Sequence, residues 1–250
     1  MLRWPGLLIL LLLQTYAFSQ DFTALMREGA QEEKKLNEAG ALERYKQALH
    51  LQPANLQALN KCSELYSRVG FRLPGKAARD DYYRAAKTYA ATALSLYPND
   101  SEANCLMAIA LGRTTLNSSG KEKIHAVRAI KKYADNALRL NPANYKAWHV
   151  LGRWHYELSN LGLVERTAVK LFFGGMPKCS FKESVYAFEQ ARDLTSNFIL
   201  NYFELARAYK KNGQQAAAVA SLQKLLTLPD QTADDVQTKI QARHLLKSWQ

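Results

Sequence analysis

The sequence predicts an all-α protein, a right-handed α-solenoid in which helix pairs stack one after another. The first observation is a short segment that recurs along the chain: Ala48-Leu49-x-Leu51-x-Pro53-x-Asn55, Ala93-Leu94-x-Leu96-x-Pro98-x-Asp100 and Ala137-Leu138-x-Leu140-x-Pro142-x-Asn144. The second is that the prolines of these copies are 45 and 44 residues apart, and the third is that apolar residues at helical spacing flank each copy. Repetition at a nearly fixed period indicates one structural unit stacked on copies of itself.

Each copy predicts where one helix ends and the next begins. Proline lacks a backbone N–H and disfavours the α conformation in the residue before it, so a helix is expected to end ahead of each proline. The Asn or Asp two residues later is placed to cap the following helix, because its side chain can accept hydrogen bonds from free N–H groups. A fourth copy, Ala191-x-x-Leu194-x-Ser196, lacks the proline. The predicted unit is therefore helix, loop, helix and stop.

The residues inside the units follow a pattern of small and large side chains. Counting from the third residue after the proline position, Tyr202, Leu205, Ala206 and Tyr209 stand at 4, 7, 8 and 11, and Ala218 stands at 20. Small residues at 8 and 20 let two helices approach closely, while the large ones fill the space between them. The pattern resembles the tetratricopeptide repeat over roughly residues 21–229.

The units are longer than the 34 residues of a plain repeat of this kind. The excess lies in three segments that we expect to be long inter-helix loops: 70–80, 113–123 and 160–180. The third contains residues such as Leu163 and Leu171 that are too apolar to be left in water. We therefore expect an extra helix there, from Leu163 to Phe172, ended by Gly174-Gly175 and Pro177.

The final stretch, Thr232–Trp249, predicts a capping helix that covers the end of the stack. It opens with Asp234 and Asp235, whose negative charge suits a helix N-terminus. Its apolar residues then repeat at roughly helical spacing, namely Val236, Ile240, Leu245, Leu246 and Trp249. A stack of repeats leaves an apolar face at its end, which such a helix buries.

Residues 1–19 have the composition of a secretory signal peptide. Arg3 precedes an apolar run from Leu7 to Leu13, and Ala17 and Ser19 are small residues at the −3 and −1 positions of a cleavage site. We therefore expect a cleaved signal over 1–19, a helical repeat domain over 20–250, and an exported protein. The alternative is a retained membrane anchor with the repeats in the cytosol, although the run is shorter than the roughly 20 residues that span a bilayer.

The positive charge predicts an anionic partner. The chain has 34 Lys and Arg against 22 Asp and Glu, a formal net charge of +12. In a stack of this kind the first helix of each unit lines the concave side with its positions 2, 5, 9 and 12. In the last two units these positions give the candidate binding residues: Lys146, His149, Arg153, Tyr156, Phe203, Arg207 and Lys210. The predicted function is a scaffold that binds an acidic peptide or protein in this basic, aromatic-lined groove.

The sequence carries no pattern typical of an enzyme or a metal site. Its five histidines and three cysteines show no zinc-type spacing, no phosphate-binding glycine loop occurs, and no candidate nucleophile has an identifiable base. No groove-reading motif accompanies the positive charge, which argues against nucleic acid as the partner. We expect a non-enzymatic protein with no catalytic residue, no metal and no cofactor.

One set of segments points to a particular protein family more specifically than the repeat itself does. It comprises Trp148-His149-Val150-Leu151-Gly152-Arg153-Trp154-His155-Tyr156-Glu157, Leu171-Phe172-Phe173-Gly174-Gly175-Met176-Pro177 and Leu228-Pro229-x-x-Thr232-x-Asp234-Asp235. These segments resemble the regulator of microtubule dynamics family, best over 141–248. The resemblance implies a non-enzymatic helical protein associated with microtubules and membranes. It leaves open a second function, a membrane-tethered microtubule-binding regulator, which requires that residues 1–19 are retained and that the repeats face the cytosol.

Overall fold

The computed structural model describes residues 21–115, 120–173 and 177–249, and all the regular structure in these ranges is helical. A first helix is described from residue 21 to 34. It is followed by α2 (Glu38–Leu51), α3 (Leu56–Arg72), α4 (Lys76–Leu96), α5 (Ser101–Thr115), α6 (Gly120–Leu140), α7 (Tyr145–Ser159), α8 (Leu163–Phe173), α9 (Phe181–Leu194), α10 (Ile199–Lys211), α11 (Gln215–Thr227) and α12 (Asp235–Trp249). The expected signal or anchor over 1–19 lies outside the described residues.

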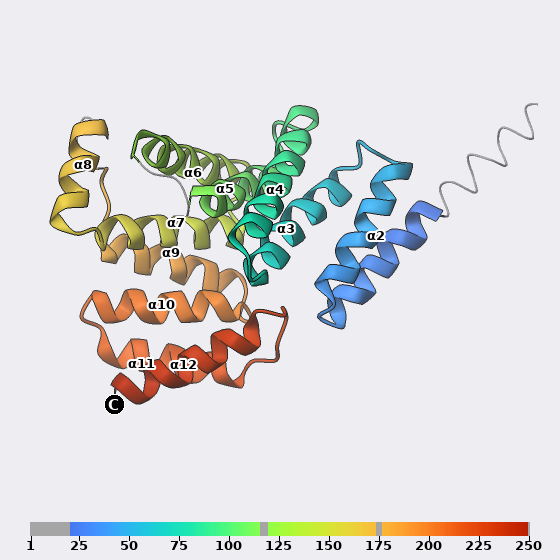
Figure 1. Cartoon of the computed structure of the whole chain (residues 1–250). Helices are drawn as coiled ribbons and strands as arrows, with labels where there is room; N and C mark the ends of the chain where they lie inside the picture. The colour runs from blue at the N-terminus through green and yellow to red at the C-terminus, as the bar shows by residue number, and fades with distance from the viewer. Residues whose placement is uncertain (1–20, 116–119, 174–176, 250) are drawn as a thin grey trace, which may run out of the picture.

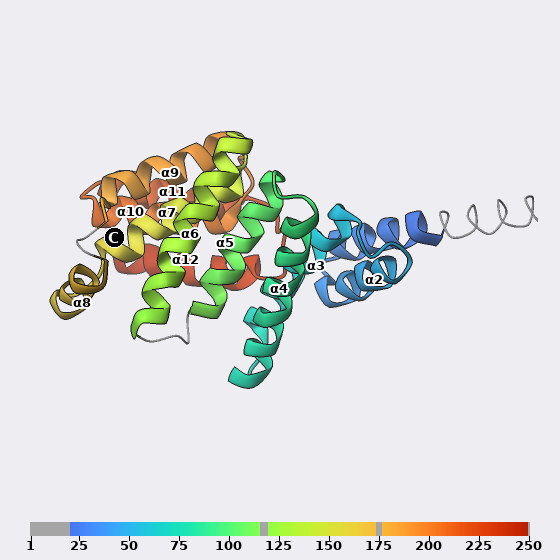
Figure 2. The same cartoon turned by 90° about the horizontal axis from the view of Figure 1, so that it is seen from above.

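The helices stack as pairs into an all-α solenoid (Figure 1, Figure 2). α3 packs on α4, α5 on α6, α7 on α9, and α10 on α11. The first helices of neighbouring pairs also touch, because α5 contacts both α3 and α7, and α7 contacts α10. The fold class predicted from the repeats is confirmed. We call the surface formed by α3, α5, α7 and α10 the inner face.

The recurring segment sets the helix ends as predicted. α2, α4 and α6 each end two residues before the proline of their copy. The Oδ1 atoms of Asn55, Asp100 and Asn144 accept hydrogen bonds from the backbone N–H three residues further on, at 3.1, 2.7 and 3.0 Å. Each such cap stabilises the start of a helix by about 1 kcal/mol. Local chemistry therefore fixes the boundaries of the units.

Two of the three segments expected to be long loops are mostly helix. α3 continues to Arg72 and α4 begins at Lys76, so only residues 73–75 join them. α4 and α6 have 21 residues each. In the described residues the excess length thus extends helices: α4 begins with Lys76-Ala77-Ala78-Arg79, residues that favour helix, and Arg113–Thr115 continue α5. The third segment contains the expected extra helix, α8, but leaves Leu163 and Leu171 in solvent where burial was expected.

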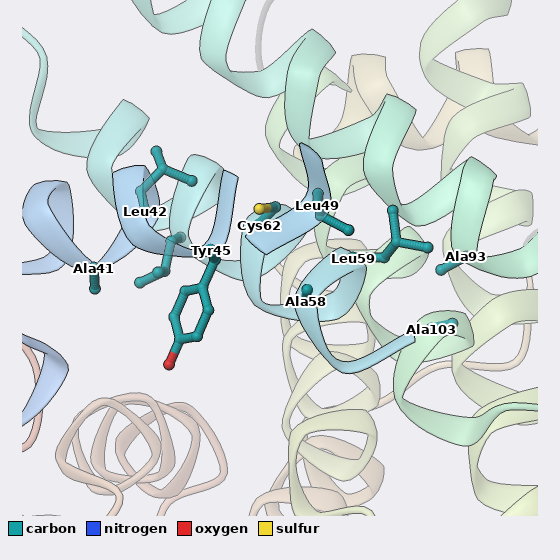
Figure 3. Close-up of a cluster of buried hydrophobic side chains, with 10 residues drawn as sticks. Ala41, Leu42, Tyr45, Leu49, Ala58, Leu59, Cys62, Ala93 and Ala103 are labelled. Atoms are coloured by element: carbon teal, nitrogen blue, oxygen red, sulfur yellow. The ribbon is translucent and has the colours of Figure 1, made fainter. Parts of the chain in front are cut away.

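The packing of the first units shows how small and large residues alternate (Figure 3). Ala41, Ala58 and Ala103 are fully buried, and Tyr45 packs among them with 1% of its surface exposed. Cys62 belongs to the same cluster, and burial raises the pKa of its thiol to about 12. The thiol is therefore protonated at neutral pH, and it fills space as a small apolar group.

Gly152 lets α7 and α9 approach closely. A Cβ atom at this position would lie 2.6 Å from Cδ1 of Phe188, whose ring is fully buried. We expect Gly152→Ala to lower the free energy of unfolding by about 1–3 kcal/mol, because the ring is packed on all sides. Urea unfolding followed by circular dichroism measures this loss.

Gly112→Ala in α5 is the matched control for that substitution. Apart from its chain neighbours and the backbone of α5 itself, no described atom lies within 4 Å of a Cβ built at Gly112. The same methyl group is therefore expected to raise stability by up to about 1 kcal/mol through helix propensity. Equal effects of the two substitutions would contradict the packing argument.

α12 covers the end of the stack, as predicted. Ala242, Leu245 and Leu246 pack against the cluster formed by α10 and α11. Val236 and Ile240, in contrast, are exposed, which differs from the prediction. Polar contacts hold the start of α12 instead, because the buried Asp235 carboxylate accepts hydrogen bonds from the N–H groups of Gln231 and Thr232, each at 2.8 Å. In the described part of the chain, no helix is both long enough and apolar enough to cross a membrane.

Candidate functional site

Lys146 joins three helices of the inner face. Its Nζ atom, on α7, lies 3.0 Å from Oε1 of Glu64 on α3 and 2.7 Å from Oε1 of Glu102 on α5. Burial disfavours the Glu64 carboxylate, but nearby cations, of which Lys146 acts most strongly, outweigh burial and lower the pKa of Glu64 to about 2. The sequence predicted that Lys146 binds a ligand. The structure instead gives this ammonium group two carboxylate partners within the chain.

Glu38 holds the first units against the segment that leads into α12. Its side chain pairs with Arg68, lies 2.6 Å from Nη2 of Arg72, and accepts a hydrogen bond from the Ala233 N–H at 3.2 Å. Arg72 also pairs with Asp234 at 3.0 Å. Figure 1 shows this segment beside α2, although the two are far apart in sequence. Ion pairs within the chain therefore occupy the N-terminal half of the inner face.

Three of the seven predicted binding residues lie in the interior. His149, Tyr156 and Phe203 are 7%, 4% and 9% exposed. The first helices of neighbouring pairs are in contact, so position 5 of both units and position 12 of α7 pack between helices, whereas Lys210 at position 12 of α10 is exposed. These side chains are packed beneath the inner face and do not project into solvent.

His149 is held as a neutral imidazole. Its Nδ1 lies 3.0 Å from Oδ1 of Asn201, and Nδ2 of Asn201 donates to the Phe188 carbonyl oxygen at 2.9 Å. Since Oδ1 is therefore the accepting atom, Nδ1 of His149 is the one that carries hydrogen. Burial lowers the pKa of His149 to about 3. This histidine is a structural residue that connects α7 with α9 and α10.

We expect this histidine to make the fold sensitive to acid. Its pKa falls from 6.5 to about 3 on folding, so the unfolded chain takes up a proton that the folded chain does not. The contribution of neutral His149 to the free energy of unfolding is fully present above pH 6.5 and is lost as the pH falls towards 3. His149→Gln is expected to give a shallower pH dependence, measured by urea unfolding between pH 7 and 4. The exposed His244→Gln serves as the control, and identical slopes for both variants would refute the assignment.

Arg153 and Arg207 lie on the C-terminal half of the inner face. Arg207 lies over the ring of Tyr156, 4.8 Å from the ring centre, and pairs with Glu204 at 2.8 Å. Arg153 pairs with Glu157 at 3.4 Å, and both of these side chains are substantially exposed. An exposed pair of this kind contributes little stability, so a carboxylate from outside can compete for Arg153 at small cost.

Lys210 is the last cation of the predicted set. Its Nζ lies 2.5 Å from Oε1 of Gln215 and 5.4 Å from the centre of the Trp249 ring. Its partners are thus an amide and an aromatic face, and its charge is not neutralised by either of them. The end of α10 therefore carries a net positive charge beside the capping helix.

Sequence reasoning missed Arg113, at the end of α5. Its guanidinium lies 4.6 Å from the centre of the Phe71 ring, and it makes no ion pair with a carboxylate of the described residues. Burial, together with the charge of Arg153, lowers the pKa of Arg113. The segment 113–123 was expected to be a loop, so the helical position of this arginine was not apparent. The carboxylate of Asp234 acts on the charge of Arg113 without forming an ion pair with it, so Arg113 adds positive charge to this part of the inner face.

Residues 21–250 match the family described as "Regulator of microtubule dynamics protein 1-3". The chain is 28% identical over 163 residues to regulator of microtubule dynamics protein 1 of Caenorhabditis elegans, covering 64% of this chain and 71% of that protein. It is 31% identical over 144 residues to regulator of microtubule dynamics protein 3 of Xenopus laevis, covering 56% of this chain and 31% of that protein. The murine protein 1 is 28% identical over 162 residues, and the chain spans about half of its length (53%).

Two solved structures show the same fold. TTC0263, a thermophilic TPR protein of Thermus thermophilus, superposes with a TM-score of 0.65 at 16% identity, covering 90% of this chain and 99% of that one. Yeast Tom70 gives a TM-score of 0.55 at 14% identity, covering 91% of this chain and 39% of that one. The solenoid is thus of the tetratricopeptide type. Together with the match over residues 21–250, this agrees with the resemblance seen in the sequence, and the chain belongs to the regulator of microtubule dynamics family.

Proposed function

We propose that this chain binds an acidic peptide or protein segment on its inner face, along the second halves of α5, α7 and α10. A solenoid of the tetratricopeptide type is a protein-interaction scaffold. The observation that carries the proposal is the excess of cations there: Arg153 has an exposed ion pair, the partners of Lys210 are an amide and an aromatic ring, and Arg113 lies against the Phe71 ring beyond ion-pair distance of Asp234. Guanidinium groups in such a setting favour a carboxylate, which they can bind through two parallel hydrogen bonds.

The proposed binding set differs from the one that the sequence predicted. Arg153, Arg207 and Lys210 are retained, and Arg113 is added. Lys146 is omitted because Glu64 and Glu102 already neutralise its charge. The buried residues of the predicted set, His149, Tyr156 and Phe203, act as supports, and Tyr156 orients Arg207 through the contact with its ring.

A fluorescein-labelled peptide of six glutamates tests the proposal. Fluorescence polarisation at low salt is expected to show binding, and Arg113→Gln and Arg153→Gln are each expected to weaken it about tenfold, since a hydrogen bond to a charged group contributes about 1.5–3 kcal/mol. Raising the salt concentration is expected to weaken binding further.

Arg84→Gln is the matched control. Arg84 is exposed on α4 and pairs only locally, with Asp81. If this substitution weakens peptide binding as much as Arg153→Gln does, the interaction is a general effect of net charge and the proposed site is wrong. Unchanged circular dichroism spectra would show that the variants remain folded.

We propose as a second function that a membrane-tethered chain binds microtubules; its support is that the relatives are named regulators of microtubule dynamics. Microtubules are acidic polymers, so the same positively charged inner face would bind them. The two functions differ in location: the first goes with an exported protein that has lost residues 1–19, and the second with a chain that keeps them. Intact-mass measurement of fractions from the native host distinguishes these cases. Retention in a membrane fraction, followed by co-sedimentation with polymerised tubulin, would favour the second function.

A further inference from the structure

The outward face of α8 is largely apolar, with Thr167 as an exposed polar residue within it. Leu163 and Val164 are each 83% exposed and Leu171 is 76% exposed. At 100° per residue these three side chains lie within about a third of the helix circumference. An amphipathic helix of a globular protein normally turns its apolar stripe towards the core. In α8 the stripe faces solvent instead.

The opposite side of α8 fixes the helix to the solenoid. Val169 is buried, and Arg166 donates hydrogen bonds to the carbonyl oxygens of Ser159 and Leu161 at 2.7 and 3.0 Å. The carboxylate of Glu165 accepts a hydrogen bond from the Gly162 N–H at 2.9 Å at the start of the helix. α8 contacts α6 and lies at the edge of the molecule (Figure 1, Figure 2). The fold therefore holds the apolar stripe in an exposed position.

Positive charge lies beside this stripe. Lys170 is exposed and follows the stripe on the same side of α8. The neighbouring helix α6 contains six Lys and Arg but only one Glu and one Asp. One of these cations, Lys131, is paired with Asp135 at 2.7 Å. α8 thus combines exposed aliphatic side chains with Lys170, and the helix α6 that it contacts carries a net positive charge.

We propose that this face of α8 docks on an anionic lipid bilayer. Leu163, Val164 and Leu171 would insert at the level of the head groups, while Lys170 and the cations of α6 contact anionic head groups. Aliphatic residues bordered by lysine and arginine are typical of helices that lie in the membrane interface. A partner protein with an acidic, apolar helix is the competing occupant. The proposal is independent of the peptide site, because it rests on a different surface.

A fluorescent probe at residue 171 tests the insertion directly in the full-length chain. In a Cys179→Ser background, the two remaining cysteines are buried, so Leu171→Cys can be labelled with the polarity-sensitive dye NBD. We expect the emission to shift to the blue with vesicles that contain phosphatidylserine and phosphatidylcholine, and much less with phosphatidylcholine alone. The same dye on Ala216→Cys, exposed on α11, is expected not to shift.

The probe separates this proposal from the alternatives. If the chain binds vesicles only through residues 1–20, the dye at 171 does not shift and the proposal fails. An equal shift with both kinds of vesicle would refute the role of charge. A shift with an acidic amphipathic peptide but not with vesicles would assign the surface to a protein partner.

Substitutions of exposed residues give a second measurement. The double substitution Val164→Gln/Leu171→Gln is expected to lower the α8-dependent partitioning into anionic vesicles about tenfold or more, because the apolar area is lost. Lys170→Gln is expected to lower it about fivefold. Circular dichroism should be unchanged, because all three side chains are exposed. Unchanged partitioning of the double variant would overturn the proposal.

Discussion

Lys146→Met is expected to lower the free energy of unfolding by about 3 kcal/mol. The substitution removes the cation that lies between Glu64 and Glu102 and leaves the Glu64 carboxylate largely buried with fewer positive neighbours. A buried charge that loses its partner costs about 3–5 kcal/mol, and the remaining cations near Glu64 reduce that cost. Urea unfolding at pH 7 measures the loss.

The pH dependence provides the test of this assignment. In the wild type the pKa of Glu64 falls from 4.5 to about 2 on folding, so its stabilising contribution is present above pH 4.5 and is lost as the pH falls towards 2. In Lys146→Met, protonation of Glu64 relieves the destabilisation, so the deficit relative to wild type should shrink between pH 7 and pH 3. Adding Glu64→Gln should recover part of the loss at pH 7.

Lys76→Met is the control for this pair. Lys76 forms an exposed ion pair with Asp80 within α4, at 2.7 Å. Such pairs contribute about 0.3–0.5 kcal/mol, so only a small change is expected. A deficit of Lys146→Met that stays constant with pH would show that lost packing, rather than lost charge, is the cause.

Glu38→Gln is expected to cost about 3 kcal/mol and to loosen both ends of the solenoid. The carboxylate is 2% exposed, and its charge is matched by two arginines, Arg68 and Arg72. A neutral amide keeps the shape but leaves these guanidinium groups without their main counter-charge. Because the same carboxylate accepts a hydrogen bond from Ala233, amide hydrogen exchange should increase in α12 as well as in α2.

The control lies on the same helix. Glu43 is exposed and pairs with Lys46 at 2.8 Å, so Glu43→Gln is expected to change stability by a few tenths of a kcal/mol. If exchange in Glu38→Gln increased in α2 alone, the proposed link between the first units and α12 would be incorrect.

The fold followed closely from local sequence signals. The prolines and the asparagines two residues after them predicted the ends of α2, α4 and α6 and the caps of α3 and α7, because these effects act within one helical turn. A small residue at position 8 predicted a close helix contact; in the unit that begins with α7 this residue is Gly152, and its neighbour is Phe188. The lengths of the connections were less well predicted, since extra residues can extend a helix or a loop.

The candidate site was only partly predictable. Helical periodicity placed Lys146, Arg153 and Arg207 on one side of the stack. The sequence therefore predicted a basic surface there. It gave no indication that Glu64, 82 residues earlier, lies 3.0 Å from Lys146. Nor did it indicate Arg113, whose position depends on how far α5 extends.

The sequence by itself determined the helices, their caps, the repeat and the excess of positive charge, because each depends on neighbouring residues or on composition. The tertiary structure decided which of those charges are already neutralised within the chain and which remain available. It also decided that the apolar stripe of α8 faces outward. The physical reason is that ion pairing and burial depend on the curvature of the stack, which brings Glu38 to Ala233 across 195 residues and which no local signal encodes.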